Sequence, residues 1–151
     1  EDLAVITEEA RSLLKDTGYP GIKVFQFAFA DKNIDYLPCN INSPNCVVYT
    51  GTHDNMTTPQ WFNSISKSER ALYKKSCRPT KGENHTHCLI RTAMSTVADT
   101  VIIPMGDYMG IKAEGRINEP STTGNNWTWR LKNKYDTAKL RDIIKMLSVR
   151  E

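Results

Sequence analysis

Apolar runs alternate with polar, breaker-rich segments along the chain, and their spacing predicts alternating helices and strands. Continuous apolar runs at residues 22–30, 47–50 and 100–103 are rich in Val, Ile and Phe, which is typical of strands buried on both faces. Elsewhere the apolar spacing and helix-end signals predict helices over residues 8–16, 57–65, 66–75, 89–98 and 136–147. Helices that alternate with such strands predict an α/β protein with a parallel sheet.

Local end signals mark two of these helices. Thr7 precedes a segment that has two acids in its first turn, and Gly18 follows its last turn, as a helix with a favourable macrodipole requires. Ser66 and Glu69 have the spacing of a capping box, in which each residue satisfies a backbone N–H of the other. These signals predict where the two helices begin, independently of the apolar pattern.

The stretch VVYTGTHDNMT, residues 47–57, carries the strongest candidate chemistry. An apolar strand ends here in His53, Asp54 and Asn55. In parallel α/β architectures the residues just past the carboxyl end of a strand line the ligand site, so an imidazole beside a carboxylate suggests an active site. A capped turn is an alternative, because Thr, Asp and Asn also favour turns and helix starts.

Two long polar segments flank this stretch in sequence. Residues 31–45 predict a loop at the carboxyl end of the first strand, and residues 105–131 predict a longer excursion on the same side as His53 and Asp54. Of the two tryptophans in the excursion, Trp127 and Trp129, at least one is expected to pack in the core.

Composition excludes several functional classes. The 151 residues correspond to about one domain, and the net charge of +3 comes from 20 basic and 17 acidic residues that are interspersed. No basic run is longer than the pair Lys74 and Lys75, so neither nucleic acid nor an anionic membrane is an expected partner. The chain shows no signal-peptide pattern and no apolar run of spanning length, and a cytoplasmic location is expected.

The four cysteines are expected to be free thiols, since a chain of this length does not need disulfides to fold. A zinc site could recruit residues near the middle of the chain, namely Cys77, His85, His87 and Cys88. However, no CxxC pair is present, so no metal and no cofactor are expected, and a zinc-binding module is the weakest alternative.

Seven segments, taken together, resemble in order and spacing the carboxyl-terminal half of the amylomaltases, also called 4-α-glucanotransferases or disproportionating enzymes. The likeness covers residues 1–131. The combination of GTHDN with NWxWR at this separation, and with EDL upstream, is specific. The segments are EDLAVIT, GYPGIKVFQFAF, YLPCN, VVYTGTHDN, IIPMGDYMG, GRINEP and GNNWTWRL.

The resemblance implies that residues 1–151 are the carboxyl-terminal portion of a (β/α)8 barrel, incomplete as given. It implies transfer of α-1,4-glucan segments between maltooligosaccharide acceptors by a retaining double displacement. Glu1 matches the general acid/base, and Asp54 matches the carboxylate that stabilises the transition state, with His53 beside it. The nucleophile of the family lies on an earlier strand that this sequence does not contain, so the chain alone is expected to be inactive.

The same resemblance assigns substrate contacts to Phe27, Asp31 and Asn126. A noncatalytic carbohydrate-binding or structural role is the alternative function. The sequence departs from the usual family pattern at four positions, none of which is Glu1 or Asp54; they are Ala4, Cys39, Met56 and Gly106.

Overall fold

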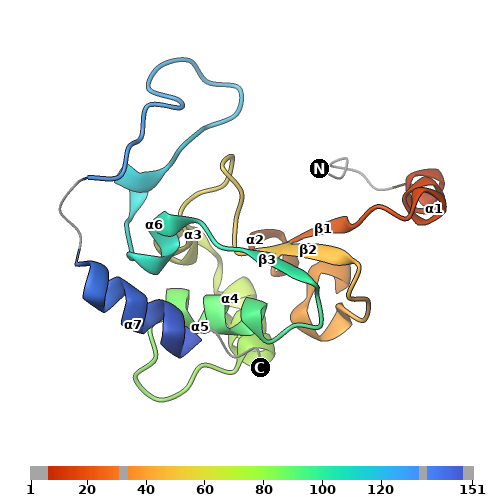
Figure 1. Ribbon diagram of the computed structural model, residues 1–151, viewed down its shortest axis with the longest axis horizontal. Coiled ribbons are helices and arrows are strands. Elements are labelled where there is room, and N and C mark those ends of the chain that lie inside the picture. Colours follow the sequence, from red (N-terminus) through yellow and green to blue (C-terminus); the bar gives the residue numbers. More distant parts are fainter. Residues whose placement is uncertain (1–6, 31–33, 133–135, 148–151) are drawn as a thin grey trace.

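The computed structural model describes residues 7–30, 34–132 and 136–147 (Figure 1). Its centre is a sheet of three parallel strands in the order β1-β2-β3, formed by β1 (Gly21–Val24), β2 (Cys46–Tyr49) and β3 (Thr100–Ile102). The predicted parallel sheet is therefore confirmed. Because Val24, Tyr49 and Ile102 share one level of the register, the three strands end at the same edge of the sheet.

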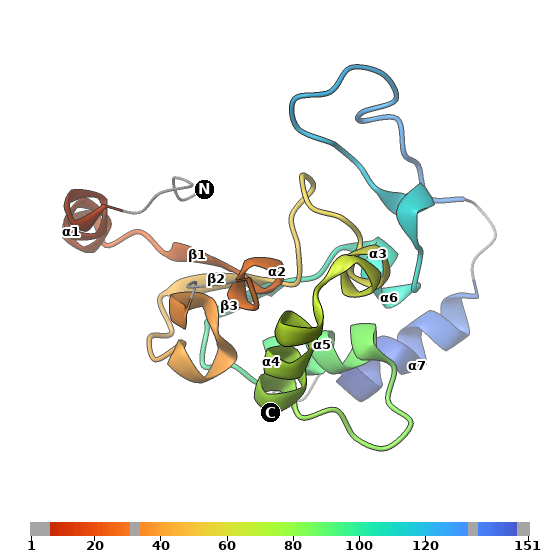
Figure 2. The ribbon, with the colours of Figure 1, turned by 180° about the vertical axis from the view of Figure 1, so that it is seen from behind.

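The two faces of the sheet are covered unequally. Helices α4 (Lys67–Cys77), α5 (His85–Met94) and α7 (Thr137–Leu147) lie on one side of the sheet in both views (Figures 1 and 2). Val48 and Cys46 of β2 are buried on one face of the sheet. Side chains alternate between faces along a strand, so Ile22, Val47 and Ile102 share the opposite face, where Ile102 is 44% exposed.

The first strand is shorter than its apolar run predicts. It ends at Val24, and residues Phe25–Ala28 form a short helix, α2. The backbone N–H of Gln26 donates to Thr50 O at 3.2 Å, and its side-chain Nε2 donates to Met56 O at 2.8 Å, so the chain is turned at the sheet edge by contacts with residues that follow β2. Gly51 leaves space for this amide, since a Cβ there would lie 2.6 Å from Gln26 Nε2.

The local end signals identify the helix ends well. In α1 (Glu8–Thr17) the Thr7 hydroxyl accepts from Ala10 N at 3.3 Å, and Gly18 closes the helix in the left-handed region. The capping box of Ser66 and Glu69 at the start of α4 is present in both directions. The helix predicted over residues 57–65 is α3 (Thr58–Ser64). None of the described residues forms a helix long and apolar enough to cross a membrane.

The helix predicted over residues 89–98 ends earlier than the apolar pattern suggested. Helix α5 stops at Met94, where the Ser95 hydroxyl donates to Arg91 O at 2.7 Å and the Thr96 hydroxyl donates to Ala93 O at 2.8 Å. Ala98 is nevertheless buried, because the chain passes the core again on its way into β3. Ala98 thus belongs to the core without belonging to the helix.

Aromatic rings form the centre of the helical side of the core. Tyr73 lies fully buried with Phe29 and Phe62 at centroid distances of 5.5 and 5.1 Å, and its hydroxyl donates to His85 O at 2.8 Å. His85 stacks on Phe62 at 3.8 Å, so packing accounts for its position. Among the described residues, no group of three or more His, Cys, Asp or Glu side chains is placed to hold a metal ion, and the four cysteines are free.

A largely buried ion pair fastens α5 to the link that precedes it. Arg91 donates through Nε and Nη2 to the two oxygens of Glu83, at 2.8 and 2.9 Å. The Arg91 guanidinium lowers the pKa of Glu83 from its ordinary value of 4.5 to about 2. Because the folded-state pKa is depressed, the stabilisation is present above about pH 4.5 and is lost as the pH falls toward 2.

We expect Glu83→Gln to lower the free energy of unfolding of the intact protein by about 2 kcal/mol at pH 7, allowing for the partial exposure of Arg91. The difference from wild type should vanish as the pH approaches the depressed pKa. Urea unfolding midpoints of both proteins across this range measure it. Glu114→Gln, at an exposed position, is the matched control, and a Glu83→Gln deficit that does not change with pH would contradict this account.

The half-covered sheet face generates a second expectation. The 151-residue chain studied alone should associate or bind an apolar dye. Ile22, Val47 and Ile102 leave apolar surface open, and β1 and β3 are the outer strands of the sheet that the described residues form. Sedimentation and dye fluorescence test this. A monomer that binds no dye and unfolds in one sharp transition would show that the expectation is wrong.

Candidate functional site

The turn after β2 is held by its own side chains. The Asn55 Oδ1 atom accepts from Thr52 N at 2.8 Å and from the Thr52 hydroxyl at 2.7 Å, while Asn55 N donates to Thr52 O at 3.2 Å. This local network closes the turn on both sides of His53 and Asp54. The two side chains are therefore presented at the carboxyl edge of the sheet, as the sequence predicted.

The carboxylate of Asp54 does not cap the following helix. The residue before α3 is Thr57, and the carboxylate at the start of that helix belongs to Asp107. Asp107 is 1% exposed and accepts from Thr58 N at 2.8 Å, from the Thr58 hydroxyl at 2.7 Å and from the Thr50 hydroxyl at 2.6 Å. The structure therefore disfavours the reading of Asp54 as a helix cap.

Asp107 belongs to α6 (Met105–Tyr108), which directly follows β3 and Pro104. Through its three bonds it joins the ends of β2 and β3 to the start of α3. Asp107 lies in the IIPMGDYMG segment of the family resemblance, which gave it no role. A carboxylate a few residues past an apolar strand segment was the available signal.

The long excursion returns to the His53–Asp54 turn, as predicted. Asn118 donates from Nδ2 to Asp54 Oδ1 at 2.7 Å, and its backbone N–H donates to His53 O at 3.1 Å. Arg116 donates from Nη2 to Asp54 O at 3.3 Å. Asn118 and Arg116 lie in the GRINEP segment, but the sequence offered no reason to pair them with a turn more than sixty residues away.

His53 and Asp54 form a pair within this contact. His53 Nε2 lies 3.3 Å from Asp54 Oδ1, and the side chains are 48% and 36% exposed. Within the described residues no hydrogen bond reaches the other carboxylate oxygen, Oδ2. That oxygen is available to accept from the hydroxyl group of a ligand.

The prediction that at least one of the two tryptophans packs in the core is wrong. Trp127 is 55% exposed, its φ of 65° is in the left-handed region, and its ring centroid lies 5.0 Å from that of His53. Its backbone N–H donates to Ile117 O at 2.8 Å, which brings the ring to the turn rather than to the core. Trp129 is only partly buried and is not a member of the core.

The other predicted site residues are placed less directly. Phe27 is 45% exposed on α2, at the carboxyl edge of the sheet. Asn126 accepts through Oδ1 from Glu119 N at 3.0 Å and donates through Nδ2 to the carbonyl and hydroxyl oxygens of Thr122, both at 3.1 Å, so its amide is occupied within the excursion. Glu1 and Asp31 lie outside the described residues.

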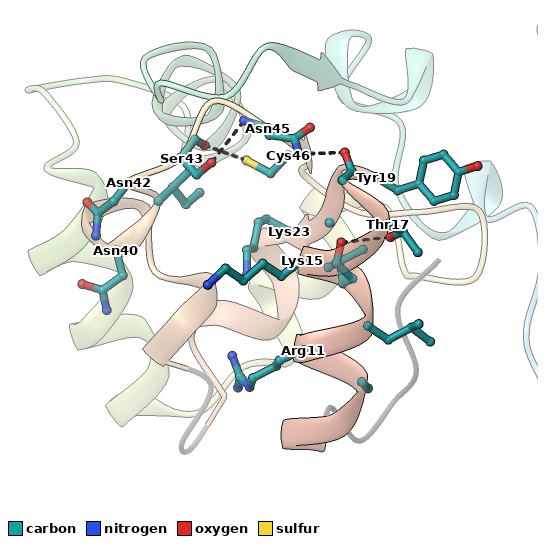
Figure 3. Close-up of a pocket in the computed structure, with 16 residues that line it drawn as sticks. Arg11, Lys15, Thr17, Tyr19, Lys23, Asn40, Asn42, Ser43, Asn45 and Cys46 are labelled. Atoms are coloured by element: carbon teal, nitrogen blue, oxygen red, sulfur yellow. Dashed lines mark hydrogen bonds between the residues drawn. The ribbon is translucent and has the colours of Figure 1, made fainter.

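A separate cavity of about 780 Å³ opens between α1 and the segment 40–46 (Figure 3). Gly21 and Cys46, the first residues of β1 and β2, line it, so it lies at the amino edge of the sheet, opposite His53 and Asp54. The basic side chains Lys15 and Lys23 extend from its walls. The cavity is thus not part of the site at the carboxyl edge.

Comparison with known sequences identifies the family. The sequence model of one family, described as 4-alpha-glucanotransferase, matches residues 1–136. The chain belongs to the 4-alpha-glucanotransferase family. The resemblance of the seven sequence segments is therefore confirmed.

Individual 4-alpha-glucanotransferases show how much of the family is represented. The chain is 43% identical to the enzyme of Clostridium butyricum over 150 residues, which is 98% of this chain and 31% of that protein. It is 40% identical over 152 residues to the chloroplastic/amyloplastic enzyme of Solanum tuberosum, covering 95% of this chain and 26% of that protein. The chain thus spans less than a third of the length of these relatives.

A solved structure of the family agrees with the fold. The amylomaltase from Streptococcus agalactiae, in complex with acarbose, superposes with a TM-score of 0.86 at 34% sequence identity, covering 97% of this chain and 31% of that chain. The parallel sheet and its helices therefore correspond to part of an amylomaltase.

The contacts of Arg116 generate a prediction about the excursion. Arg116 donates to Asn118 O at 3.0 Å, to Glu119 Oε1 at 3.2 Å and to Asp54 O at 3.3 Å. In Arg116→Ala we expect the backbone amide of Asn118, which is hydrogen-bonded to His53 O, to exchange its hydrogen about tenfold faster. The reason is that the lost hydrogen bonds stabilise this contact by about 1.4 kcal/mol.

Hydrogen exchange followed by mass spectrometry or NMR measures this change. Arg130→Ala is the matched control, since among the described residues Arg130 donates to Trp127 O and Trp129 O alone, inside the excursion. Equal hydrogen exchange of the Asn118 backbone amide in both variants would show that Arg116 does not stabilise the contact between the excursion and the turn.

Proposed function

We propose that the chain is part of the catalytic barrel of a 4-α-glucanotransferase, which transfers α-1,4-glucan segments to sugar acceptors by a retaining double displacement. One observation carries the proposal: Asp54 stands at the carboxyl edge of a parallel sheet with one oxygen fixed by neighbours and the other available. In (β/α)8 barrels this edge forms the active site. The three parallel strands are consistent with consecutive strands of such a barrel.

The chemistry assigned to Asp54 suits its surroundings. Positive charge develops on the sugar ring in the oxocarbenium-like transition state of glycosyl transfer. A carboxylate whose bonds to sugar hydroxyls strengthen at that stage stabilises the transition state more than the ground state. His53, whose Nε2 lies 3.3 Å from Asp54 Oδ1 and whose side chain is partly exposed, is the second partner for a sugar hydroxyl.

The remaining roles follow from the family resemblance. Glu1 acts as general acid/base, protonating the leaving oxygen and then deprotonating the acceptor. Phe27, Asp31 and Asn126 contact the glucan, and the exposed ring of Phe27 at the carboxyl edge supports its part. The nucleophile comes from a strand outside this sequence, so the reaction requires a longer protein that contains the chain.

The substrate class rests on the same family. A maltooligosaccharide analogue, acarbose, is bound in the related amylomaltase structure, which supports α-1,4-glucans and maltooligosaccharides as substrates here. A noncatalytic glucan-binding role has no comparable support. A cytoplasmic location stays a prediction, because relatives include a chloroplastic/amyloplastic enzyme.

The decisive substitution is Asp54→Asn in the full-length enzyme that carries this chain. We expect kcat for maltotriose disproportionation to fall on the order of a hundredfold, with KM nearly unchanged, because the lost charge acts mainly in the transition state. Steady-state product analysis on maltotriose measures both constants.

Asp16→Asn, at an exposed position on α1, is the matched control and should leave kcat unchanged. Asparagine keeps the shape of Asp54 and serves turns and caps about as well. Near-normal turnover in Asp54→Asn would therefore mean that Asp54 has only a structural role.

A further inference from the structure

We infer that Asn118 is a positioning residue for Asp54: its carboxamide fixes the orientation of the carboxylate that faces the sugar. The inference rests on the proposed function of Asp54. The bond from Asn118 Nδ2 to Asp54 Oδ1, at 2.7 Å, joins the excursion to the turn after β2. It is a side-chain bond between segments that are far apart in sequence, so its geometry is set by the tertiary structure.

The bond distinguishes the two oxygens of the carboxylate. Oδ1 faces two groups, Asn118 Nδ2 at 2.7 Å and His53 Nε2 at 3.3 Å, whereas Oδ2 has no such partner within the described residues. Rotation of the Asp54 carboxylate about its last side-chain torsion would have to break the short hydrogen bond from the Asn118 carboxamide. Asn118 therefore holds one oxygen toward the protein and leaves the other for the ligand.

The main-chain N–H and C=O groups of Asn118 are themselves hydrogen-bonded. Asn118 N donates to His53 O at 3.1 Å, and Asn118 O accepts from Arg116 Nε at 3.0 Å. Arg116 also donates to Asp54 O, so donor and acceptor are fixed to the same turn. These bonds involve the main chain at position 118, and a substitution of the side chain leaves them in place.

Because the site is partly exposed to solvent, an effect on the orientation of Asp54 can be distinguished from an effect on the stability of the fold. Asp54 is about one-third exposed, and water can replace a lost donor at little cost in folding free energy. A carboxylate that can then rotate is less often in the productive orientation, and catalysis is far more sensitive to orientation than folding is. The expected signature is a loss of turnover with little loss of stability.

The first test uses Asn118→Ala in the full-length enzyme. We expect kcat on maltotriose to fall about ten- to a hundredfold with KM changed by less than about twofold. Asn63→Asp, on an exposed turn of α3, controls for amide loss elsewhere and should match wild type. Unchanged kcat in Asn118→Ala, or a KM that rises as much as kcat falls, would overturn the inference.

A second test exchanges the two side chains. Asn118→Asp alone places two carboxylates in contact and should lower both kcat and the Tm. The double variant Asp54→Asn with Asn118→Asp restores a hydrogen bond of reversed polarity, so its Tm should return toward wild type while kcat stays as low as in Asp54→Asn. A double variant whose Tm stays as low as that of Asn118→Asp would overturn the inference, whereas one that recovers turnover would show that the charge at position 54 is dispensable, against the proposed function.

The test with Asp54→Asn and Asn118→Asp can also be made if Asn118→Ala fails to fold, since both of these substitutions preserve side-chain shape. Failure of the proposed function appears separately, as a wild-type enzyme that does not convert maltotriose. In that case, a Tm of the double variant no higher than that of Asn118→Asp alone would additionally show that the bond itself is absent.

Discussion

The functional edge of the sheet depends on the hydrogen bonds of the buried Asp107 carboxylate. A buried carboxylate is costly unless it is fully hydrogen-bonded, and this one accepts from the main chain and hydroxyl of Thr58 and from the hydroxyl of Thr50. Those donors come from the end of β2 and the start of α3, while the acceptor follows β3. One buried carboxylate thus joins the chain after β2, the chain after β3 and the start of α3.

From this fixed point the turn and the excursion form successive layers of decreasing burial. Thr50 is buried with Asp107, the turn residues Thr52, Asp54 and Asn55 are half-buried, and His53 is exposed. Rigidity therefore decreases toward solvent, as is usual where a rigid scaffold carries the residues that meet a ligand. The excursion, which is distant in sequence, adds hydrogen bonds from Arg116 and Asn118 to Asp54.

Features governed by neighbours in sequence were predictable, and features governed by distant partners were not. The caps at Thr7 and at Ser66 with Glu69 were predicted because each involves residues three apart. The end of β1 was missed because the partners of Gln26 follow the next strand, and an apolar run does not distinguish strand from buried helix. The pattern at the end of the second strand indicated His53 and Asp54, and the family resemblance added their roles. Asn118 and the exposed position of Trp127 depend instead on folded contacts across the site.

The close approach of Gly51 to Gln26 restricts how this sequence can diverge. A Cβ at position 51 would lie 2.6 Å from Gln26 Nε2, so the amide would have to move, and it would lie in tight contact with Asn55 Cβ at 3.2 Å. The amide in turn satisfies Met56 O, so retreat of Gln26 would leave a carbonyl unpaired. Substitutions at positions 26 and 51 are thus physically coupled: a side chain at position 51 fits best with a shorter residue at position 26 and with another donor for Met56 O.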